Sequence, residues 1–230
     1  YGDSKALKKA IGKNTVGFLV EPIQGEGGVI VPPAGYLQEC FKICKDNNVL
    51  FIADEIQTGL GRTGKLFACD HEEVKPDIYV LGKALSGGFY PVSAVCCDNY
   101  IMDVLEPGDH GSTFGGSSIA CAAGIASLDV ILEERLCERA EEMGKYFMQR
   151  LRQMNSPHVD HIRGKGLLIG VVIKETSGLA RPFCEKLMEE GILAKETHHS
   201  VIRFAPPLVI SKDEIDWALS RIAKVLGGKA

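Results

Sequence analysis

The chain has 230 residues, of which 45% are hydrophobic and 24% are charged, a composition typical of a globular protein with a sizeable core. Its formal net charge of −4 excludes the strongly basic surface expected of a nucleic-acid-binding or anionic-membrane-binding protein. No apolar run approaches the roughly 20 residues that a membrane-spanning helix needs. We therefore expect no nucleic-acid partner and no membrane partner.

Apolar strands alternate with helical segments along the first half of the chain. Each predicted strand is a short, fully apolar run, which is typical of strands buried in a parallel sheet. Strands are predicted over 16–21, 49–55, 78–82 and 92–97, and helices over 3–11 and 35–48. From residue 117 to about residue 154 the pattern is helical, in more than one segment.

The last third of the chain predicts a second, smaller unit. It contains strands over 167–173 and 201–204, a helix over 179–190, and a final helix that begins at Ser211. Ser211 and Glu214 have the spacing of a capping box for that last helix. The whole pattern indicates an α/β protein with a mostly parallel sheet.

The eight cysteines have the positions of core residues instead of disulfide partners. Cys40 and Cys44 have helical spacing, Cys96 and Cys97 end an apolar strand, and Cys121 lies among small residues in a helix. The sequence has no Cys-x-x-Cys pair, which argues against a zinc site. We predict buried free thiols, no metal, and a reducing compartment: the cytoplasm, or the mitochondrial matrix of a eukaryote.

Polar residues end several of the apolar runs. Glu21 ends the first, Asp54 and Glu55 end the second, and Lys83 follows the third. In α/β sheets, ligands bind beyond the carboxyl ends of the parallel strands, so these side chains are candidates for one pocket. The residues after Lys83 (Ala-Leu-Ser-Gly-Gly) are mostly small and would leave space around its amine.

The stretch GLGRTGK (59–65) supports a rival hypothesis, a nucleoside triphosphatase. It matches most of the phosphate-binding pattern G-x-x-x-x-G-K-[ST], and the acidic strand end before it resembles a magnesium-binding strand. Two features argue against this hypothesis. Leu66 stands where a hydroxyl should bind Mg²⁺, and the loop follows the acidic strand directly, without its own strand and helix.

An amine and a carboxylate in one pocket suit the chemistry of pyridoxal 5'-phosphate (PLP), whose aldehyde bonds covalently to a lysine. Lys83 would be that lysine, and burial would lower its pKa toward the nucleophilic form. Asp54 would face the pyridine nitrogen and keep it protonated. Gln57 would donate to the ring oxygen, and Ile56 would pack on a face of the ring.

These residues lie in stretches that resemble the class-III PLP-dependent aminotransferases, which include ornithine, acetylornithine and 4-aminobutyrate aminotransferases. The stretches follow the family order over nearly the whole chain: EPIQGEGG (21–28), ADEIQTGLGRTG (53–64), LGKALSGG (81–88), HGSTFGG (110–116) and RGKGLL (163–168). The resemblance implies the aspartate-aminotransferase-like (type I PLP-dependent transferase) fold. Residues 1–127 would form part of the large cofactor-binding domain, and residues 128–230 the linking helix and small C-terminal domain.

The resemblance also assigns roles to single residues. Lys83 matches the Schiff-base lysine and proton shuttle, Asp54 the partner of the pyridine nitrogen, and Gln57 the partner of the ring oxygen. Ser112 and Thr113 match residues that reach the cofactor phosphate of a neighbouring subunit, so the resemblance implies at least a homodimer.

Within the class, three stretches most resemble the ornithine aminotransferases: YPVSAV (90–95), EPGDHGSTFGG (106–116) and VIRFAPPLVI (201–210). The implied reaction transfers the δ-amino group of L-ornithine to 2-oxoglutarate and yields glutamate 5-semialdehyde and glutamate. Acetylornithine or another omega-amino-acid aminotransferase is the alternative. Glu26 and Arg203 match a gating pair near the substrate, and the glycines on both sides of Glu26 are expected to ease its movement.

The sequence departs from the family in two ways. Ser117-Ser118 replaces the usual Asn-Pro at a helix start, and we expect the helix to survive because serine caps helices well. The chain also matches only the C-terminal part of such an enzyme, so the missing N-terminal half is an implied partner. An inactive fragment that lacks this half is therefore a second hypothesis, from a different class of function.

Overall fold

The computed structural model describes residues 1–228, and these residues form two compact units. Unit 1 comprises Tyr1–Pro22, Pro32–Leu60 and Phe67–Glu134. Unit 2 comprises Ile23–Val31, Gly61–Leu66 and the described residues from Arg135 onward. Each unit has its own sheet and its own hydrophobic core. Two short segments of the first half of the chain thus fold with the second half.

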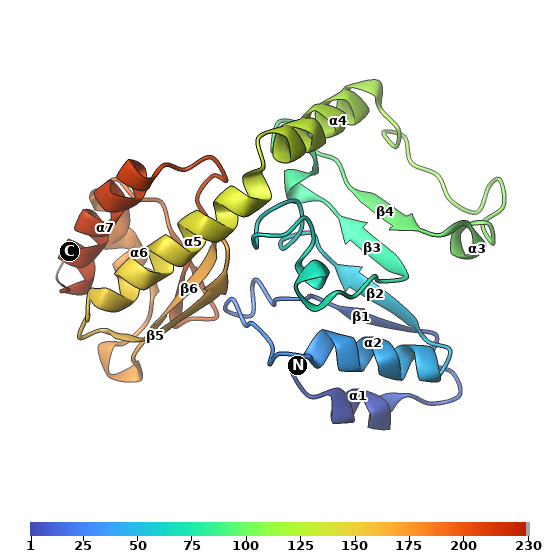
Figure 1. Cartoon of the computed structure of the whole chain (residues 1–230), viewed down its shortest axis with the longest axis horizontal. Helices are drawn as coiled ribbons and strands as arrows, with labels where there is room; N and C mark the ends of the chain where they lie inside the picture. The colour runs from blue at the N-terminus through green and yellow to red at the C-terminus, as the bar shows by residue number, and fades with distance from the viewer. Residues whose placement is uncertain (229–230) are drawn as a thin grey trace. The chain divides into compact units, whose positions relative to one another are not determined.

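Unit 1 is built on a sheet with the strand order β1-β2-β3-β4 (Figure 1). Its strands are β1 (Gly17–Val20), β2 (Leu50–Asp54), β3 (Ile78–Leu81) and β4 (Ala94–Cys97). The first three run parallel, and β4 pairs antiparallel with β3. Because β2 and β3 are parallel neighbours, their carboxyl ends lie at the same edge of the sheet.

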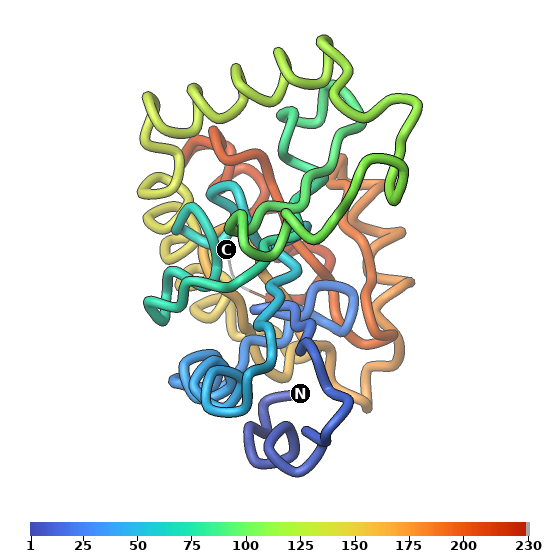
Figure 2. Tube along the Cα trace, turned by 90° about the vertical axis from the view of Figure 1, so that its right-hand side faces the viewer, coloured from blue at the N-terminus to red at the C-terminus, as the bar shows by residue number. Residues whose placement is uncertain are grey.

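Helix α2 (Tyr36–Asp46) packs on this sheet, and α1 (Ser4–Ala10) lies beside α2 in both Figure 1 and Figure 2. The core between α2 and the strands contains ten buried residues: Val20, Tyr36, Leu37, Cys40, Cys44, Val49, Phe51, Ala53, Cys69 and Val74. The apolar positions of α2 recur every three or four residues, which places them on the face that meets the sheet.

The N-terminus of α2 is stabilised by a side chain from elsewhere in the chain. Gly35 precedes the helix with φ 82° and has no side chain that can cap it. The Glu72 carboxylate, at the end of the 3-10 helix η1 (Ala68–Glu72), accepts hydrogen bonds from the N–H groups of Gly35 (3.1 Å) and Leu37 (2.9 Å). Its negative charge also complements the helix dipole.

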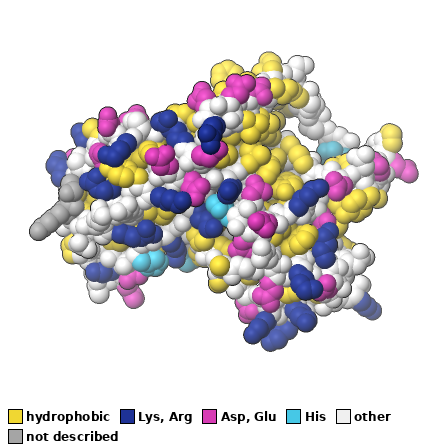
Figure 3. All heavy atoms as spheres, viewed as in Figure 1, with side chains coloured by type: hydrophobic (Ala, Val, Ile, Leu, Met, Phe, Trp, Pro, Cys, Tyr) yellow, Lys and Arg dark blue, Asp and Glu magenta, His cyan; other side chains and the backbone are white. Residues whose placement is uncertain are grey.

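The rest of unit 1 follows β3. It comprises the 3-10 helix η2 (Lys83–Ser86), the short helix α3 (Asn99–Met102), an exposed loop over 103–117, and the long helix α4 (Ser118–Glu133). Helix α4 forms as predicted, but the Ser117 side chain makes no capping hydrogen bond. Figure 3 shows hydrophobic side chains gathered on and just below α4, where the exposed residues include Ile119, Ile125 and Leu132. Such a gathering is typical of a surface that contacts other protein.

Unit 2 has an antiparallel sheet with the order β5-β6-β8-β7. Its strands are β5 (Val159–Lys165), β6 (Leu168–Ile173), β7 (Lys195–Thr197) and β8 (Val201–Phe204). The helices α5 (Leu136–Gln153), α6 (Arg181–Glu189) and α7 (Lys212–Leu226) supply the core beside it, and a 3-10 turn, η3 (Glu175–Ser177), follows β6. No helix within residues 1–228 is long and apolar enough to cross a membrane.

The two faces of the β6–β8 pair have different partners. Alternate residues of these strands, among them Ile169, Val171 and Phe204, belong to the core that the helices share. Leu168 is adjacent to Ile169 in the strand and so lies on the opposite face, where it packs with Ile23 and Val29 from the segment Ile23–Val31. That segment therefore covers the face of the sheet opposite the helical core.

The structure differs from the prediction in several places. The predicted parallel arrangement is that of unit 1, whereas the sheet of unit 2 is antiparallel and two of its strands, β5 and β7, were not predicted. All eight cysteines are free, but Cys96 and Cys121 are exposed instead of buried, and Cys97 and Cys137 are half-buried.

The capping box that starts α7 forms as predicted. The Ser211 hydroxyl accepts a hydrogen bond from the Glu214 N–H (3.2 Å), and the Glu214 carboxylate accepts one from the Ser211 N–H (2.8 Å). We expect Ser211→Ala to lower the free energy of unfolding of unit 2 by about 1 kcal/mol, because an N–H at the helix start loses its acceptor. Thermal unfolding followed by circular dichroism measures this.

The matched control for this prediction is Ser220→Ala, on the exposed side of the same helix. Since alanine has the higher helix propensity and no cap is lost there, the control should be neutral or slightly stabilising. Equal destabilisation by both variants would contradict the capping role of Ser211.

Candidate functional site

Asp54 and Lys83 lie at neighbouring strand ends in unit 1. Asp54 is the last residue of β2 and pairs in register with Val80 of β3, and Lys83 follows β3 after a single glycine, Gly82. A Cβ added to Gly82 would lie 3.5 Å from the Ile56 side chain, so Ile56 borders the same strand end. The structure thus brings a carboxylate, an apolar side chain and the segment that carries the amine to one edge of the sheet.

Lys83 is held in an uncommon backbone conformation. Its φ is 48°, in the left-handed region that a residue with a side chain enters only at a cost of roughly 1–3 kcal/mol. The turn that follows Lys83 is held by Ser86, which is buried and exchanges hydrogen bonds with the backbone of Tyr90. Strain of this kind is often found at functional sites.

The prediction that the Lys83 side chain is buried is wrong. Its side chain is exposed, next to the exposed residues Gly87, Gly88 and Phe89. Asp54 is half-buried, and its Oδ1 atom accepts a hydrogen bond from the Ile56 N–H at 3.1 Å. The strand end that carries the two side chains is therefore open.

Glu55 follows Asp54 and is more deeply buried than Asp54, with 1% of its surface exposed. Its carboxylate accepts hydrogen bonds from the Thr58 hydroxyl and from the Cys69 N–H (2.9 Å). Burial raises the pKa of Glu55, while these hydrogen bonds act in the opposite direction. Glu55 thus fixes the turn after β2 to η1 and is not part of the open strand end.

The other predicted cofactor residues occupy two places in unit 1. Gln57 is half-buried in the turn that follows β2. Ser112 and Thr113 are exposed in the loop between α3 and α4, where the Ser112 hydroxyl accepts a hydrogen bond from the Gly115 N–H at 3.0 Å. The hydroxyls of this loop face solvent, so a group outside unit 1 has access to them.

The segment Gly61–Leu66, within the stretch that suggested a nucleotide-binding loop, is packed inside unit 2. The Arg62 side chain is half-buried, and its guanidinium donates to the carbonyl groups of Leu167 (3.1 Å) and Pro206 (2.6 Å). A Cβ on Gly64 would lie 2.9 Å from the Glu141 side chain. The element that follows this loop is the 3-10 helix η1, not an α-helix, so the loop lacks the α-helix N-terminus that a phosphate cradle uses.

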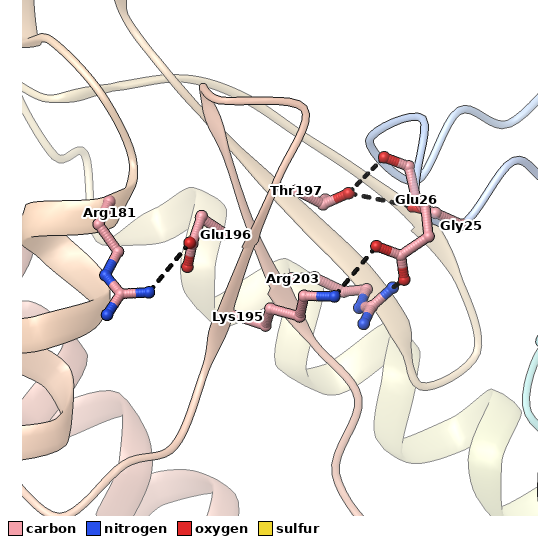
Figure 4. Close-up of polar contacts among 7 residues, drawn as sticks. All are labelled: Gly25, Glu26, Arg181, Lys195, Glu196, Thr197 and Arg203. Carbon is pink, nitrogen blue, oxygen red and sulfur yellow. Dashed lines mark hydrogen bonds and ion pairs between the residues drawn. The ribbon is translucent and has the colours of Figure 1, made fainter.

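Glu26 and Arg203 form an ion pair in unit 2, as Figure 4 shows. Arg203 Nη1 donates to Glu26 Oε1 at 2.7 Å, and the Arg203 side chain is only 16% exposed. Lys195 Nζ lies 3.1 Å from Oε2, the other oxygen of the same carboxylate. The hydrogen bond from Arg203 and, next, that from Lys195 lower the pKa of Glu26 to about 2. The carboxylate therefore remains ionised at neutral pH.

The turn that carries Glu26 sits on the sheet because β6 has a glycine there. Gly170 pairs in register with Arg203, and a Cβ at Gly170 would lie 3.0 Å from the Val29 side chain. A glycine inside a strand commonly marks such a close approach of backbone. The sequence LLIGVVI contained this signal, but nothing in the sequence named the segment that approaches.

The backbone of this turn is held at three carbonyl groups. Arg163 donates from both Nε (3.0 Å) and Nη2 (2.7 Å) to the Gly28 carbonyl. The Thr197 hydroxyl donates to the Glu26 carbonyl (2.5 Å) and lies 3.5 Å from that of Gly25. The flanking glycines were expected to ease movement of the turn, but these bonds hold its backbone in place, so the Glu26 carboxylate can move by rotation of its side chain.

Three residues of this site were missed in the sequence: Arg163, Lys195 and Thr197. Lys195 and Thr197 are alternate residues of β7, and Lys195 stands opposite Arg203 in the β7–β8 pair. Only a prediction of β7 and its register would have placed them beside Glu26. Arg163 lies in the stretch RGKGLL, which identified the family but did not show which group the arginine binds.

Comparison with known proteins identifies the family. A sequence model of the aminotransferase class-III family matches residues 3–226. The chain belongs to the class-III aminotransferases. Members of this family are PLP-dependent enzymes, so the family resemblance seen in the motifs is confirmed, and the rival assignment to the nucleoside triphosphatases is not supported.

The most similar curated relatives include two bacterial ornithine aminotransferases. The enzyme of Geobacillus sp. (strain WCH70) is 58% identical over 228 residues, and that of Bacillus subtilis (strain 168) is 58% identical over 226 residues. These alignments cover 99% and 98% of this chain but 56% of each relative. The chain thus spans little more than half the length of the curated relatives it matches.

Solved structures of aminotransferases have the same fold. Ornithine aminotransferase from Toxoplasma gondii matches with a TM-score of 0.95 and 49% identity, over 98% of this chain and 54% of that one. Acetylornithine aminotransferase from Elizabethkingia anophelis matches with a TM-score of 0.92 and 50% identity, over 98% of this chain and 58% of that one. The predicted aspartate-aminotransferase-like α/β fold is confirmed.

The strand-end residues of this class-III aminotransferase fit PLP in their chemistry. The T. gondii structure contains PLP at partial occupancy in its active site. In this chain, Lys83 offers an exposed amine for the aldehyde, and Asp54 offers a carboxylate for the pyridine nitrogen, with Ile56 beside them. These are the donor groups that the cofactor requires.

We expect Glu55→Ala to destabilise unit 1 by about 1–3 kcal/mol, because buried donors at Thr58 and Cys69 lose their acceptor. Glu55→Gln keeps an acceptor oxygen and should destabilise less. Since burial raises the pKa of Glu55 above its ordinary value of 4.5, the folded protein holds this proton more tightly than the unfolded chain. Wild-type stability should therefore fall relative to Glu55→Gln as the pH rises above about 4.5.

Chemical unfolding of the wild type and both Glu55 variants between pH 4 and pH 8 measures these differences. Glu133→Gln, at an exposed position of α4, is the matched control and should leave the pH profile unchanged. A Glu55→Gln profile parallel to that of the wild type would contradict the raised pKa.

Proposed function

We propose that these 230 residues belong to a PLP-dependent ornithine aminotransferase, which transfers the δ-amino group of L-ornithine to 2-oxoglutarate and yields glutamate 5-semialdehyde and glutamate. The observation that carries this proposal is the ion pair between the shielded Arg203 and the half-exposed Glu26. It is supported by 58% identity to bacterial ornithine aminotransferases.

The ion pair suits an enzyme that binds two substrates of opposite charge. Ornithine has a cationic δ-amine, whereas 2-oxoglutarate has a second carboxylate in the corresponding place. An arginine alone would repel the cation, but Arg203 paired with Glu26 is neutralised and tolerates it. When Glu26 rotates away, Arg203 can bind the second carboxylate with two parallel hydrogen bonds.

At the strand ends of unit 1, Lys83 and Asp54 would hold the cofactor. PLP, when bound, supplies an electron sink that stabilises negative charge on the substrate carbon next to the transferred nitrogen. Lys83 Nζ would bond to the cofactor aldehyde and, once displaced by the substrate amine, move the proton of that carbon. Asp54 would keep a proton on the pyridine nitrogen, with Gln57 donating to the ring oxygen and Ile56 packing against the ring.

We further propose that the active form is at least a homodimer. Ser112 and Thr113 present hydroxyls on an exposed loop, where they suit a phosphate bound to a neighbouring subunit. The exposed hydrophobic side chains of α4 support an interface in the complete enzyme. The free thiols suit a reducing compartment, so the cytoplasm, or the mitochondrial matrix of a eukaryote, is the proposed location.

Transfer from acetylornithine is the second candidate reaction. It is favoured by 50% identity to the E. anophelis acetylornithine aminotransferase, about the same as the identity to the T. gondii enzyme. The ratio of kcat/KM for ornithine to that for N-acetylornithine separates the two. A ratio below one in the full-length enzyme would overturn the proposed amino donor.

The chain matches 56% of its relatives, so we propose that activity also needs the N-terminal half of the same enzyme. The alternative is an inactive fragment. Mass spectrometry of the intact purified protein distinguishes them, because a co-purifying N-terminal segment supports the enzyme. A stable preparation of residues 1–230 alone that binds PLP and turns yellow would contradict the need for that half.

We expect Lys83→Ala to abolish transamination in the full-length enzyme. General acid–base catalysis alone contributes roughly 10²–10⁴-fold, and the covalent link to the cofactor would be lost as well. Asp54→Asn should weaken PLP binding and slow the reaction, while its thermal unfolding stays close to that of the wild type. Borohydride reduction and peptide mapping check the assignment, and cofactor attached to a different lysine would refute it.

For the ion pair, the two half-reactions should respond in opposite ways. Glu26→Gln should leave Arg203 without its counter-charge, so the half-reaction with glutamate should gain relative to that with ornithine. Arg203→Ala should chiefly slow the half-reaction with glutamate, by an amount that corresponds to about 2–5 kcal/mol, since a charged partner of the substrate is removed. Single-turnover absorbance measurements with each substrate give both rates. Equal changes in both half-reactions would contradict a role of the pair in substrate selection and would indicate a purely structural salt bridge.

A further inference from the structure

Lys195 is a second cation on the carboxylate that we propose as a switch. Its Nζ atom contacts Glu26 Oε2 at 3.1 Å, whereas Arg203 contacts Oε1 at 2.7 Å. The two cations therefore hold different oxygens of one carboxylate (Figure 4). One contact can break while the other remains.

The sheet register makes this arrangement specific. Lys195 of β7 and Arg203 of β8 are directly opposite in an antiparallel pair, so their side chains leave the sheet on the same face. Like charges in this position destabilise a sheet unless an anion lies between them. Glu26 is that anion, and it comes from the segment Ile23–Val31, far away in the sequence.

The two cations differ in their exposure to water. The Lys195 side chain is 61% exposed and the Arg203 side chain 16% exposed. Lys195 thus sits at the solvent side of the carboxylate, and Arg203 sits on the shielded side. Thr197 and Arg163 hold the backbone of the turn, so the carboxylate leaves Arg203 by rotation of its own side chain, and its second oxygen already contacts Lys195.

We propose that Lys195 is a positioning residue that holds the Glu26 carboxylate while Arg203 binds the second carboxylate of a dicarboxylic substrate. Lys195 thereby sets the preference between dicarboxylic and cationic substrates. This inference rests on the proposed function of the Glu26–Arg203 pair, and it adds a third charged group to it.

The energetic reason is the difference between the two positions of Glu26. With Lys195 present, Glu26 keeps a counter-ion after it leaves Arg203, so the released state is less unfavourable. Without Lys195, the released carboxylate loses this counter-ion, and the pair with Arg203 is favoured. Loss of Lys195 should therefore hinder the dicarboxylic substrate and spare the cationic one.

The test uses Lys195→Met in the full-length holoenzyme, with Arg181→Met as the matched control. Arg181 is an exposed cation that pairs with Glu196, the neighbour of Lys195 in β7, so the control removes the same charge from the same hairpin region (Figure 4). Single-turnover rates with glutamate and with ornithine are compared. Lys195→Met should lower the glutamate-to-ornithine ratio of kcat/KM by roughly two- to five-fold, Lys195→Arg should restore it, and Arg181→Met should leave it unchanged.

A second measurement does not depend on catalysis. The pKa of the Glu26 carboxyl, followed by ¹³C NMR, should rise in Lys195→Met and stay unchanged in Arg181→Met, because only the first variant removes a charge that contacts Glu26. If Glu26→Gln changes the substrate ratio but Lys195→Met behaves like Arg181→Met, the role of Lys195 is overturned and the proposed function stands. If Glu26→Gln leaves the ratio unchanged, the proposed switch is overturned, and the role of Lys195 with it.

Discussion

The site in unit 2 depends on one constraint: a guanidinium that is largely shielded from water must have an anion within reach. Arg203 lies in a strand with 16% of its side chain exposed, where an unpaired charge would be costly. The structure meets this need with Glu26, which a turn from the beginning of the chain brings over the sheet. Three further residues act on that turn: Gly170 leaves space for it, and Arg163 and Thr197 hold its backbone by hydrogen bonds.

The same constraint explains why the pair suits a switch better than a permanent salt bridge. A permanent bridge is most stable when both partners are enclosed and fully hydrogen-bonded. Glu26, by contrast, is 55% exposed, lies on a fixed backbone, and has a different cation on each carboxylate oxygen. Under the proposed function, its carboxylate would leave Arg203 while keeping a cation as partner, and a substrate carboxylate would take its place on Arg203.

The sequence predicted the elements whose signals are local. Apolar runs located β2, β3 and β8, and the family motifs located Lys83, Asp54, Glu26 and Arg203. The strands β5 and β7 were missed because they contain charged residues and lie at the two edges of their sheet, where apolar runs are not required. Lys195 was missed with β7, since its place beside Glu26 follows from strand register. The exposure of Lys83 and the burial of Glu55 also depend on tertiary packing, which residue type alone does not report.

Glu26 and Glu55 illustrate how the surroundings decide the role of identical side chains. Glu55 is enclosed and satisfied by a hydroxyl and a backbone N–H, so burial raises its pKa and no competing cation approaches it. Glu26 is open and bound by cations, and its pKa falls to about 2. The first carboxylate can only fix the turn in which it lies, because its removal strands buried donors. Under the proposed function the second exchanges partners, because it is exposed and a lysine lies beside it.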